Sequence, residues 1–237
     1  MSTKEKQFQR RLERREFIRK AAAGTLIVAV GGGLYRLADE LLIQQVQAQV
    51  RNDGNARLPP GQRALESLTP MGGRPGNTRT REFRLKVHGE VKNAFSIDYD
   101  ELMKMRQVEQ EADVHCVTGW SLLGGLWSGV QVRTLAERAE LKKTANFVIF
   151  ESHHDYTANI TIKEALKPNV MVVNRLNGRP FTQEHGAPVR SLVPDLYFWK
   201  SAKWLTGIRF VKRDIPGFWE TRGFHNIGDP WKEQRYG

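Results

Sequence analysis

The sequence is poor in cysteine, and this scarcity restricts its chemistry. Cys116 is the only cysteine among 237 residues, so the chain cannot form an internal disulfide. No Cys-x-x-Cys-His sequence is present, which excludes a covalently attached haem. Internal repeats and low-complexity tracts are also absent. The hydrophobic residues, 40% of the chain, are therefore expected to build an ordinary globular core.

The positive charge of the chain is concentrated at its N-terminus. Residues 1–20 hold eight Lys or Arg against three Glu, which supplies +5 of the net charge of +11. An uncharged stretch follows at 21–34, too short and too rich in glycine to predict a membrane span. At the junction, Arg14, Arg15 and Phe17 resemble a twin-arginine export signal. The alternative is an amphipathic basic helix that lies on a membrane surface.

We therefore predict that residues 1–48 are a twin-arginine signal, or a membrane anchor if this segment is not cleaved. The protein is then expected to be periplasmic or otherwise extracytoplasmic and to interact with the twin-arginine export machinery. That route carries proteins that fold and acquire cofactors in the cytoplasm. An exposed free thiol is a liability in an oxidising compartment, so Cys116 is expected to be buried or bound to a metal.

Glycine and proline divide the remaining sequence into a linker with a wrapping arm at 49–80 and one domain at 81–237. Apolar patterns predict strands at 83–89, 108–114, 146–150, 170–173, 189–193 and 204–212, and short helices at 96–103, 132–141 and 162–167. The glycine-rich stretch at 124–130 predicts a loop, and Asn177-Gly178 predicts a hairpin turn. Together these elements predict an α+β fold: a mixed, β-rich single domain preceded by an N-terminal signal or anchor helix.

Three segments carry residue types that a generic β-rich core does not require. The first is His115-Cys116-Val117-Thr118-Gly119-Trp120-Ser121; the second runs from His185-Gly186-Ala187-Pro188-Val189-Arg190 to Lys200-Ser201-Ala202-Lys203-Trp204; the third is Gly217-Phe218-Trp219-Glu220 with Asn226-Ile227-Gly228-Asp229-Pro230-Trp231. By itself, Cys116 is compatible with a soft metal ligand, a nucleophile or a small buried hydrophobic residue.

Together the three segments resemble the molybdopterin-binding domain of the sulfite oxidase family in its small bacterial form, over roughly residues 80–237. The second segment is the most specific. The resemblance implies a molybdenum-molybdopterin cofactor, with Cys116 as the one direct protein ligand to the metal. Thiolate is a natural ligand for so soft a centre.

The resemblance also implies a binding site for the phosphate of the pterin. Family members place residues around the cofactor at the positions that match His185, Arg190, Ser201 and Lys203. Arg190 would offer a planar fork of donors and Lys203 a compact charge, while Ser201 adds a neutral donor. A solvated basic strand face is the alternative for any one of these residues taken alone.

Further cofactor contacts are expected next to the metal ligand. We predict that His115, Thr118 and Ser121 contact the cofactor, although small polar residues after a strand also form simple turns. Tyr156 lies in a region that faces the cofactor in relatives and is predicted to donate a proton or a hydrogen bond near the metal. The tryptophans are expected to form core and pocket wall rather than redox relays.

The implied function is an exported molybdenum oxidoreductase that moves an oxygen atom to or from a small sulfur-type substrate, as in sulfite oxidation. Reduction of a sulfoxide, such as oxidised methionine in proteins, is the alternative on the same cofactor. The non-enzymatic alternative is an exported anion-binding module of the same fold. In larger family members arginines bind the substrate anion, and the candidates here are Arg74, Arg79, Arg81 and Arg175.

An external electron-transfer partner is also expected, because the chain encodes no second redox group. A cytochrome or a membrane haem subunit would suit this role. Nucleic acid is not an expected partner, since no platform of basic and aromatic residues occurs outside the N-terminal signal.

Overall fold

The computed structural model describes residues 49–51 and 54–237. The predicted signal or anchor at 1–48, with Arg14, Arg15 and Phe17, lies outside the described residues. Within these described ranges, no helix is long and apolar enough to cross a membrane.

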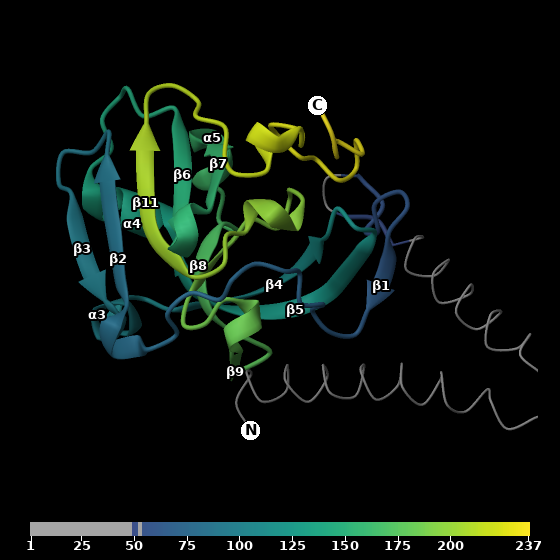
Figure 1. Cartoon of the computed structure of the whole chain (residues 1–237), viewed down its shortest axis with the longest axis horizontal. Coiled ribbons are helices and arrows are strands. Elements are labelled where there is room, and N and C mark those ends of the chain that lie inside the picture. Colours follow the sequence, from purple (N-terminus) through teal and green to yellow (C-terminus); the bar gives the residue numbers. More distant parts are fainter. Residues whose placement is uncertain (1–48, 52–53) are drawn as a thin grey trace, which may run out of the picture.

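A six-stranded mixed sheet is centred on one long strand, β5 (Trp120–Gln131). β4 (Val108–His115) pairs with it in antiparallel orientation, and β1 (Arg63–Leu65) pairs with its first residues in parallel. β8 (Met171–Leu176) pairs with its last residues and also with β9 (Arg179–Pro180) and β10 (Arg190–Leu192). The turn between β4 and β5 lies at one end of this sheet (Figure 1). Cys116 belongs to this turn, since β4 ends at His115 and β5 begins at Trp120.

The loop predicted at 124–130 is wrong, because these residues continue β5. Gly129 is needed there: a Cβ atom at this position would collide with the carbonyl oxygen of Val172 on β8, where the strand register shifts. Gly124 has a φ of 62°, a conformation that favours glycine. Glycine does not end the strand here. Gly129 allows the close approach of β8, and Gly124 allows a bend within β5.

The second sheet has the strand order β3-β2-β11-β6-β7. The strands are β2 (Arg84–Gly89), β3 (Phe95–Asp98), β6 (Phe147–Ser152), β7 (Thr157–Thr161) and β11 (Leu205–Val211). Leu85 and Val87 are fully buried, Arg84 and Lys86 are exposed and His88 is half-buried, so the alternation predicted for β2 is confirmed. This sheet supplies Ser152 and the turn before Tyr156 to the site described below.

The helices are short, as the sequence predicts. α3 (Tyr99–Lys104) begins with a capping box between Asp98 and Glu101, α4 (Val132–Ala139) buries its apolar face in the core, and α5 (Ile162–Ala165) has one turn. Five 3₁₀ turns complete the described elements: η1 (Thr80–Glu82), η2 (His153–Asp155), η3 (Gln183–His185), η4 (Phe198–Lys200) and η5 (Glu220–Arg222). The β-rich, mixed α+β class is confirmed.

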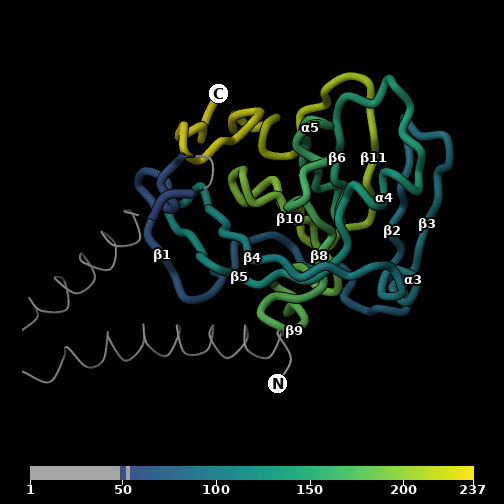
Figure 2. Tube along the Cα trace, turned by 180° about the vertical axis from the view of Figure 1, so that it is seen from behind, coloured from purple at the N-terminus to yellow at the C-terminus, as the bar shows by residue number. Residues whose placement is uncertain are grey.

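The N-terminal arm and the C-terminal segment lie side by side next to the β4–β5 end of the first sheet (Figures 1 and 2). The indole of Trp231 donates to the carbonyl of Ala56 over 2.6 Å. Arg57 binds both carboxylate oxygens of Asp113 on β4, at 2.7 and 2.8 Å. Residues far apart in sequence therefore surround the turn that carries Cys116.

Candidate molybdenum cofactor site

The Cys116 turn, residues 115–121, connects β4 to β5. The Cys116 amide donates to the carbonyl of Trp120 over 2.7 Å, and the Gly119 amide donates to the carbonyl of Cys116 over 3.0 Å. Gly119 has a φ of 92°, which closes the turn tightly. The free thiol of Cys116 is 6% exposed and lies 3.1 Å from the hydroxyl of Thr118.

His115 is held from behind by a chain of hydrogen bonds. Its Nδ1 atom lies 2.8 Å from the Ser121 hydroxyl, which donates to Gln62 Oε1 over 3.2 Å. Gln62 in turn donates to the carbonyl of Cys116 over 3.0 Å. Because the Ser121 proton goes to Gln62, His115 donates from Nδ1, and Nε2 is left as a buried acceptor with no partner among the described residues. Burial lowers the pKa of His115 to about 4, so its ring is neutral at pH 7.

These contacts separate the predicted residues of the turn by role. Thr118 touches the thiol directly and is exposed. Ser121 is fully buried and orients His115. Gln62 is part of the same chain but was not predicted, since a lone glutamine in the arm carries no sequence signal.

The cationic face, defined as His185, Arg190, Ser201 and Lys203, lies beside β10. Arg190 is 2% exposed and donates to the carbonyls of Ser201 at 2.8 Å and His185 at 3.1 Å. Burial lowers the pKa of its guanidinium to about 9. The Ser201 hydroxyl accepts the amide of Val193 over 2.9 Å, so its own proton remains available for donation.

Lys203 completes this face with a second cation. Its Nζ donates to the carbonyls of Gly72 at 2.7 Å, Glu184 at 3.1 Å and Met71 at 3.3 Å. Burial, and to a smaller extent the nearby Arg190, lowers the pKa of Lys203 to about 8. Burial is also the main cause that lowers the pKa of His185, and the charges of Arg190 and Lys203 add to it. In the part of the chain that the structure describes, neither Arg190 nor Lys203 forms an ion pair with a carboxylate.

An aromatic cluster connects the Cys116 turn to the cationic face. The guanidinium of Arg190 lies 4.2 Å from the ring centroid of Phe198. Phe198 packs edge-on against Trp120 at 6.1 Å and Trp127 at 6.2 Å, and Cys116 belongs to the same apolar cluster. The structure therefore brings the two predicted groups, distant in sequence, to one aromatic core.

Tyr156 lies near Arg190 of the cationic face, and each of the two groups affects the pKa of the other. Its hydroxyl donates to the carbonyl of Trp199 over 2.5 Å, and burial with the charge of Glu220 raises its pKa. The two residues before it, His154 and Asp155, have φ values of 60° and 57°, which non-glycine residues rarely adopt. A strained turn thus sets the direction of Tyr156.

Other residues predicted for the substrate do not reach the Cys116 turn. Arg74, Arg79, Arg81 and Arg175 are all exposed. Arg79 pairs with Glu82, and Arg175 donates to the carbonyl of Gly178. Nothing in the described contacts links the four arginines to Cys116.

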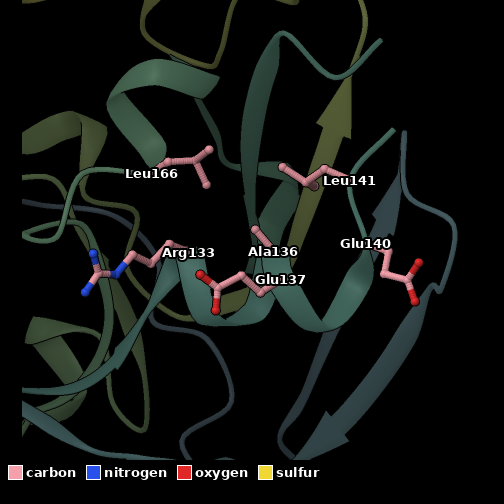
Figure 3. Close-up of a pocket in the computed structure, with 6 residues that line it drawn as sticks. All are labelled: Arg133, Ala136, Glu137, Glu140, Leu141 and Leu166. Atoms are coloured by element: carbon pink, nitrogen blue, oxygen red, sulfur yellow. The ribbon is translucent and has the colours of Figure 1, made fainter. Parts of the chain in front are cut away.

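Two surface cavities differ in their position relative to this site. The cavity in Figure 3 is lined from α4 and α5 by Arg133, Ala136, Glu137, Glu140, Leu141 and Leu166, and it shares no residue with the site. A second cavity borders the cationic face, with His153, Pro188 and Trp204 in its wall. Only the second is placed to adjoin a cofactor bound at Lys203.

Comparison with known proteins identifies the domain. The model of the oxidoreductase molybdopterin-binding domain matches residues 71–219. The oxidoreductase YuiH of Bacillus subtilis (strain 168) is 38% identical over 188 residues, which are 78% of this chain and 95% of YuiH. This chain belongs to the molybdopterin-binding oxidoreductase family.

In two further matches, this chain covers only about half the length of the matched protein. The protein-methionine-sulfoxide reductase catalytic subunit MsrP of Burkholderia mallei is 32% identical over 171 residues, 65% of this chain and 51% of MsrP. The sulfane dehydrogenase SoxCD of Paracoccus pantotrophus shares the fold with a TM-score of 0.56 at 16% identity, over 73% of this chain and 52% of the matched chain. The family, the fold and the enzyme class predicted from the sequence are therefore confirmed.

The cofactor of the family is molybdenum bound by molybdopterin, and the residues of the site suit such a group. In the described part of the chain, buried polar atoms without hydrogen-bond partners occur on His115 and Trp120 of the Cys116 turn and on Tyr197, whose backbone pairs with that of His115: they are His115 Nε2, Trp120 Nε1 and Tyr197 Oη. The hydroxyls of Ser152 and Ser191 have the same property. Each such atom costs about 1–3 kcal/mol unless a ligand or water satisfies it. A polar ligand with a phosphate matches both these atoms and the cations that lack carboxylate partners.

Proposed function

We propose that this protein is an exported molybdenum-cofactor oxidoreductase that transfers an oxygen atom at a small sulfur-type substrate, with Cys116 as the protein ligand to the metal. The observation that carries this proposal is the position of the buried free thiol, joined through one aromatic cluster to a face of cations without carboxylate partners. Thiolate suits molybdenum, and paired cations suit phosphate.

The residues of the site divide the binding of the cofactor between them. Cys116 would hold the metal as thiolate. Arg190, Lys203 and the Ser201 hydroxyl would hold the phosphate, with His185 beside them. When bound, the cofactor supplies the two-electron redox change and the oxygen-atom transfer, while the protein provides position, charge and a pocket that limits access of water.

Further residues would act on the ligands of the cofactor or on the substrate. His115 is fixed by Ser121 and keeps Nε2 free as an acceptor, and Thr118 is placed to bond the sulfur of Cys116. Tyr156 keeps its proton because its pKa is raised. It can therefore donate a hydrogen bond near the metal after leaving the Trp199 carbonyl.

Sulfite oxidation and sulfoxide reduction are both supported as the reaction. The resemblance of the motifs to the sulfite oxidase family favours sulfite. The relatives named as methionine sulfoxide reductases favour a sulfoxide about equally. Both reactions need an external electron partner, for which we propose a cytochrome or a membrane haem subunit, and the pair Arg14-Arg15 would direct export.

Metal and pterin analysis of the purified, exported protein tests the proposal. We expect about one molybdenum and one pterin per chain from a molybdenum-replete host. On loaded protein, sulfite-dependent reduction of cytochrome c and sulfoxide-dependent oxidation of a reduced dye separate the two reactions. Full loading with neither activity would reject both substrates, and the absence of molybdenum would reject the enzyme. Cell fractionation of an Arg14→Lys/Arg15→Lys variant tests export, because retention in the cytoplasm is expected.

A further inference from the structure

The C-terminal segment, residues 212–237, exposes several large apolar side chains. It lies at the edge of the molecule, beside the N-terminal arm (Figures 1 and 2). In the described part of the chain, seven large hydrophobic side chains are exposed, and four of them belong to this segment: Ile215, Trp219, Ile227 and Tyr236. A monomeric protein rarely gathers such side chains in one place unless they contact a partner or a membrane.

Contacts within the segment connect these side chains. Phe224 packs against Trp219 with ring centroids 4.9 Å apart and against Tyr236 at 5.3 Å. Asn226 donates to Asp214 over 2.6 Å, which ties together the two turns that carry the exposed isoleucines. We define the C-terminal patch as Ile215, Trp219, Phe224, Ile227 and Tyr236.

Cations predominate around the patch. The segment exposes four of them against one acid, Glu233; the cations are Lys212, Arg213, Arg222 and Lys232. Its other acids are less exposed. Glu220 is buried in its pair with Lys200, and Asp229 is half-buried 3.7 Å from Lys232. Exposed tryptophan, tyrosine and isoleucine among Lys and Arg are typical of a surface that lies at the boundary of an anionic membrane.

The described chain begins beside the same segment. Val50 is 68% exposed and pairs with Ala56, whose carbonyl accepts the indole N–H of Trp231. The guanidinium of Arg51 lies 4.1 Å from the ring centroid of Trp231. The preceding sequence contains the basic stretch at 1–20 and the uncharged stretch at 21–34, predicted to be a signal or a membrane anchor. A retained anchor would therefore attach the domain to a membrane from the side that carries the C-terminal patch.

We propose that the C-terminal patch is a membrane-contact surface that seats the folded domain on a bilayer containing anionic lipid. The apolar side chains of the patch enter the boundary of the bilayer, and the surrounding cations bind lipid head groups. This inference goes beyond the proposed function, because it concerns the position of the enzyme and needs no cofactor. A haem subunit and a second copy of this chain are the competing occupants, and neither would place Trp219 in contact with lipid.

Quenching of tryptophan fluorescence by brominated lipid tests this contact on the full-length chain. The vesicles contain phosphatidylglycerol and a phosphatidylcholine brominated on its acyl chains, and unbrominated vesicles are the reference. Residues 1–48 hold no tryptophan, so quenching reports on the domain even when the N-terminal stretch binds the vesicle. We expect the wild type to be quenched and Trp219→Phe to lose most of this quenching. Trp204→Phe, which removes a buried indole, should retain it.

The affinity for anionic vesicles tests the surrounding cations. Arg222→Gln/Lys232→Gln should weaken binding about twentyfold, from about fivefold for each cation near the membrane. The matched control, Lys104→Gln/Arg106→Gln, removes two exposed charges at the end of α3, which lies opposite the C-terminal segment in Figure 1, and should change the affinity less than twofold. Tyr236→Asp, at an exposed position, should lower both quenching and affinity. Circular dichroism confirms that each variant is folded.

Three results would overturn the proposal. Bound chain with equal quenching in the wild type and Trp219→Phe, or with none in either, would show that the patch faces away from the bilayer, as expected for a haem subunit. Equal weakening by the two double variants would show attraction by total charge alone. A dimer without vesicles that dissociates in Trp219→Phe would assign the patch to a second copy of the chain. None of these results depends on the molybdenum content, so failure of the proposed function shows separately.

Discussion

Lys200 and Lys203 stand three residues apart in one motif and belong to different regions of the molecule. Lys200 is fully buried, 2.5 Å from the buried carboxylate of Glu220, and donates to Asn159 and Asn226 at 2.8–2.9 Å. Lys203 forms no ion pair in the described residues, and its hydrogen bonds go only to backbone carbonyls. The protein itself neutralises the charge of Lys200, whereas the charge of Lys203 remains available to an anionic ligand.

This difference separates structure from binding. The Lys200–Glu220 pair joins the C-terminal segment to β7, because Asn159 lies on that strand and the indole of Trp199 also donates to Glu220 over 2.8 Å. The cationic face instead holds Arg190 buried against Phe198 and Lys203 half-buried against Trp204. A cation without a carboxylate partner is costly to keep there unless an anion binds.

The largest expected effect is the loss of the paired lysine. Lys200→Met leaves Glu220 buried and unpaired, so the free energy of unfolding should fall by about 3–5 kcal/mol. Urea denaturation measures this, and exposed Lys143→Met is the control, expected within about 0.5 kcal/mol of the wild type. A change in Lys200→Met no larger than that of the control would break the comparison.

Lys203→Met should affect the cofactor rather than the fold. We expect retention of molybdopterin to weaken about tenfold, which corresponds to the loss of one charge-assisted bond to phosphate. Pterin content after dialysis, with denaturation of the cofactor-free chain in parallel, separates the two effects. A fall in stability like that of Lys200→Met, with full pterin retention, would reverse the assignment of the two lysines.

Tyr156→Phe tests the contact between the two regions. Loss of the hydrogen bond to the Trp199 carbonyl should lower the free energy of unfolding by about 1 kcal/mol. With the cofactor bound, kcat should fall more than KM changes, because the hydroxyl is expected to act near the metal. If kcat stays at the wild-type value, Tyr156 has only a packing role.

The smallest expected effect is a pH dependence of the cofactor-free chain. The pKa of Lys203 is about 8 in the fold, below its ordinary value of 10.5, so the unfolded chain binds more protons between these values. The stability of the wild type relative to Lys203→Met should therefore rise from pH 8 to 10.5. Urea midpoints at pH 7.5 and 10 measure it, and a constant difference would show that Lys203 is not desolvated.

The sequence predicted the elements whose local signals agree with the fold. Alternation predicted β2, because this signal acts within a few residues. The helix predicted at 96–103 begins only at Tyr99, because Phe95–Asp98 pairs with β2 as strand β3. The prediction of a loop at 124–130 was wrong, because glycine is needed at position 129 by the close approach of the neighbouring strand β8. The local signal there is identical to that of a loop.

The candidate site could be predicted only where a motif carried it. Cys116, Arg190 and Lys203 were predicted from family resemblance, and the structure brings Cys116 and Arg190 to one aromatic cluster. The different roles of Lys200 and Lys203 depend on Glu220, seventeen or more residues away, which only the fold places beside Lys200. Arg235 belongs to no motif, and only the fold shows its contact with the Cys116 turn.

The central claim is that Cys116 binds the molybdenum of a cofactor held by the cationic face. X-ray absorption at the molybdenum edge, on loaded wild type and Cys116→Ser, tests it most directly. The account predicts one sulfur neighbour fewer around molybdenum in the variant, with pterin still retained through Arg190 and Lys203. An unchanged number of sulfur neighbours, with molybdenum still at full occupancy, would contradict it.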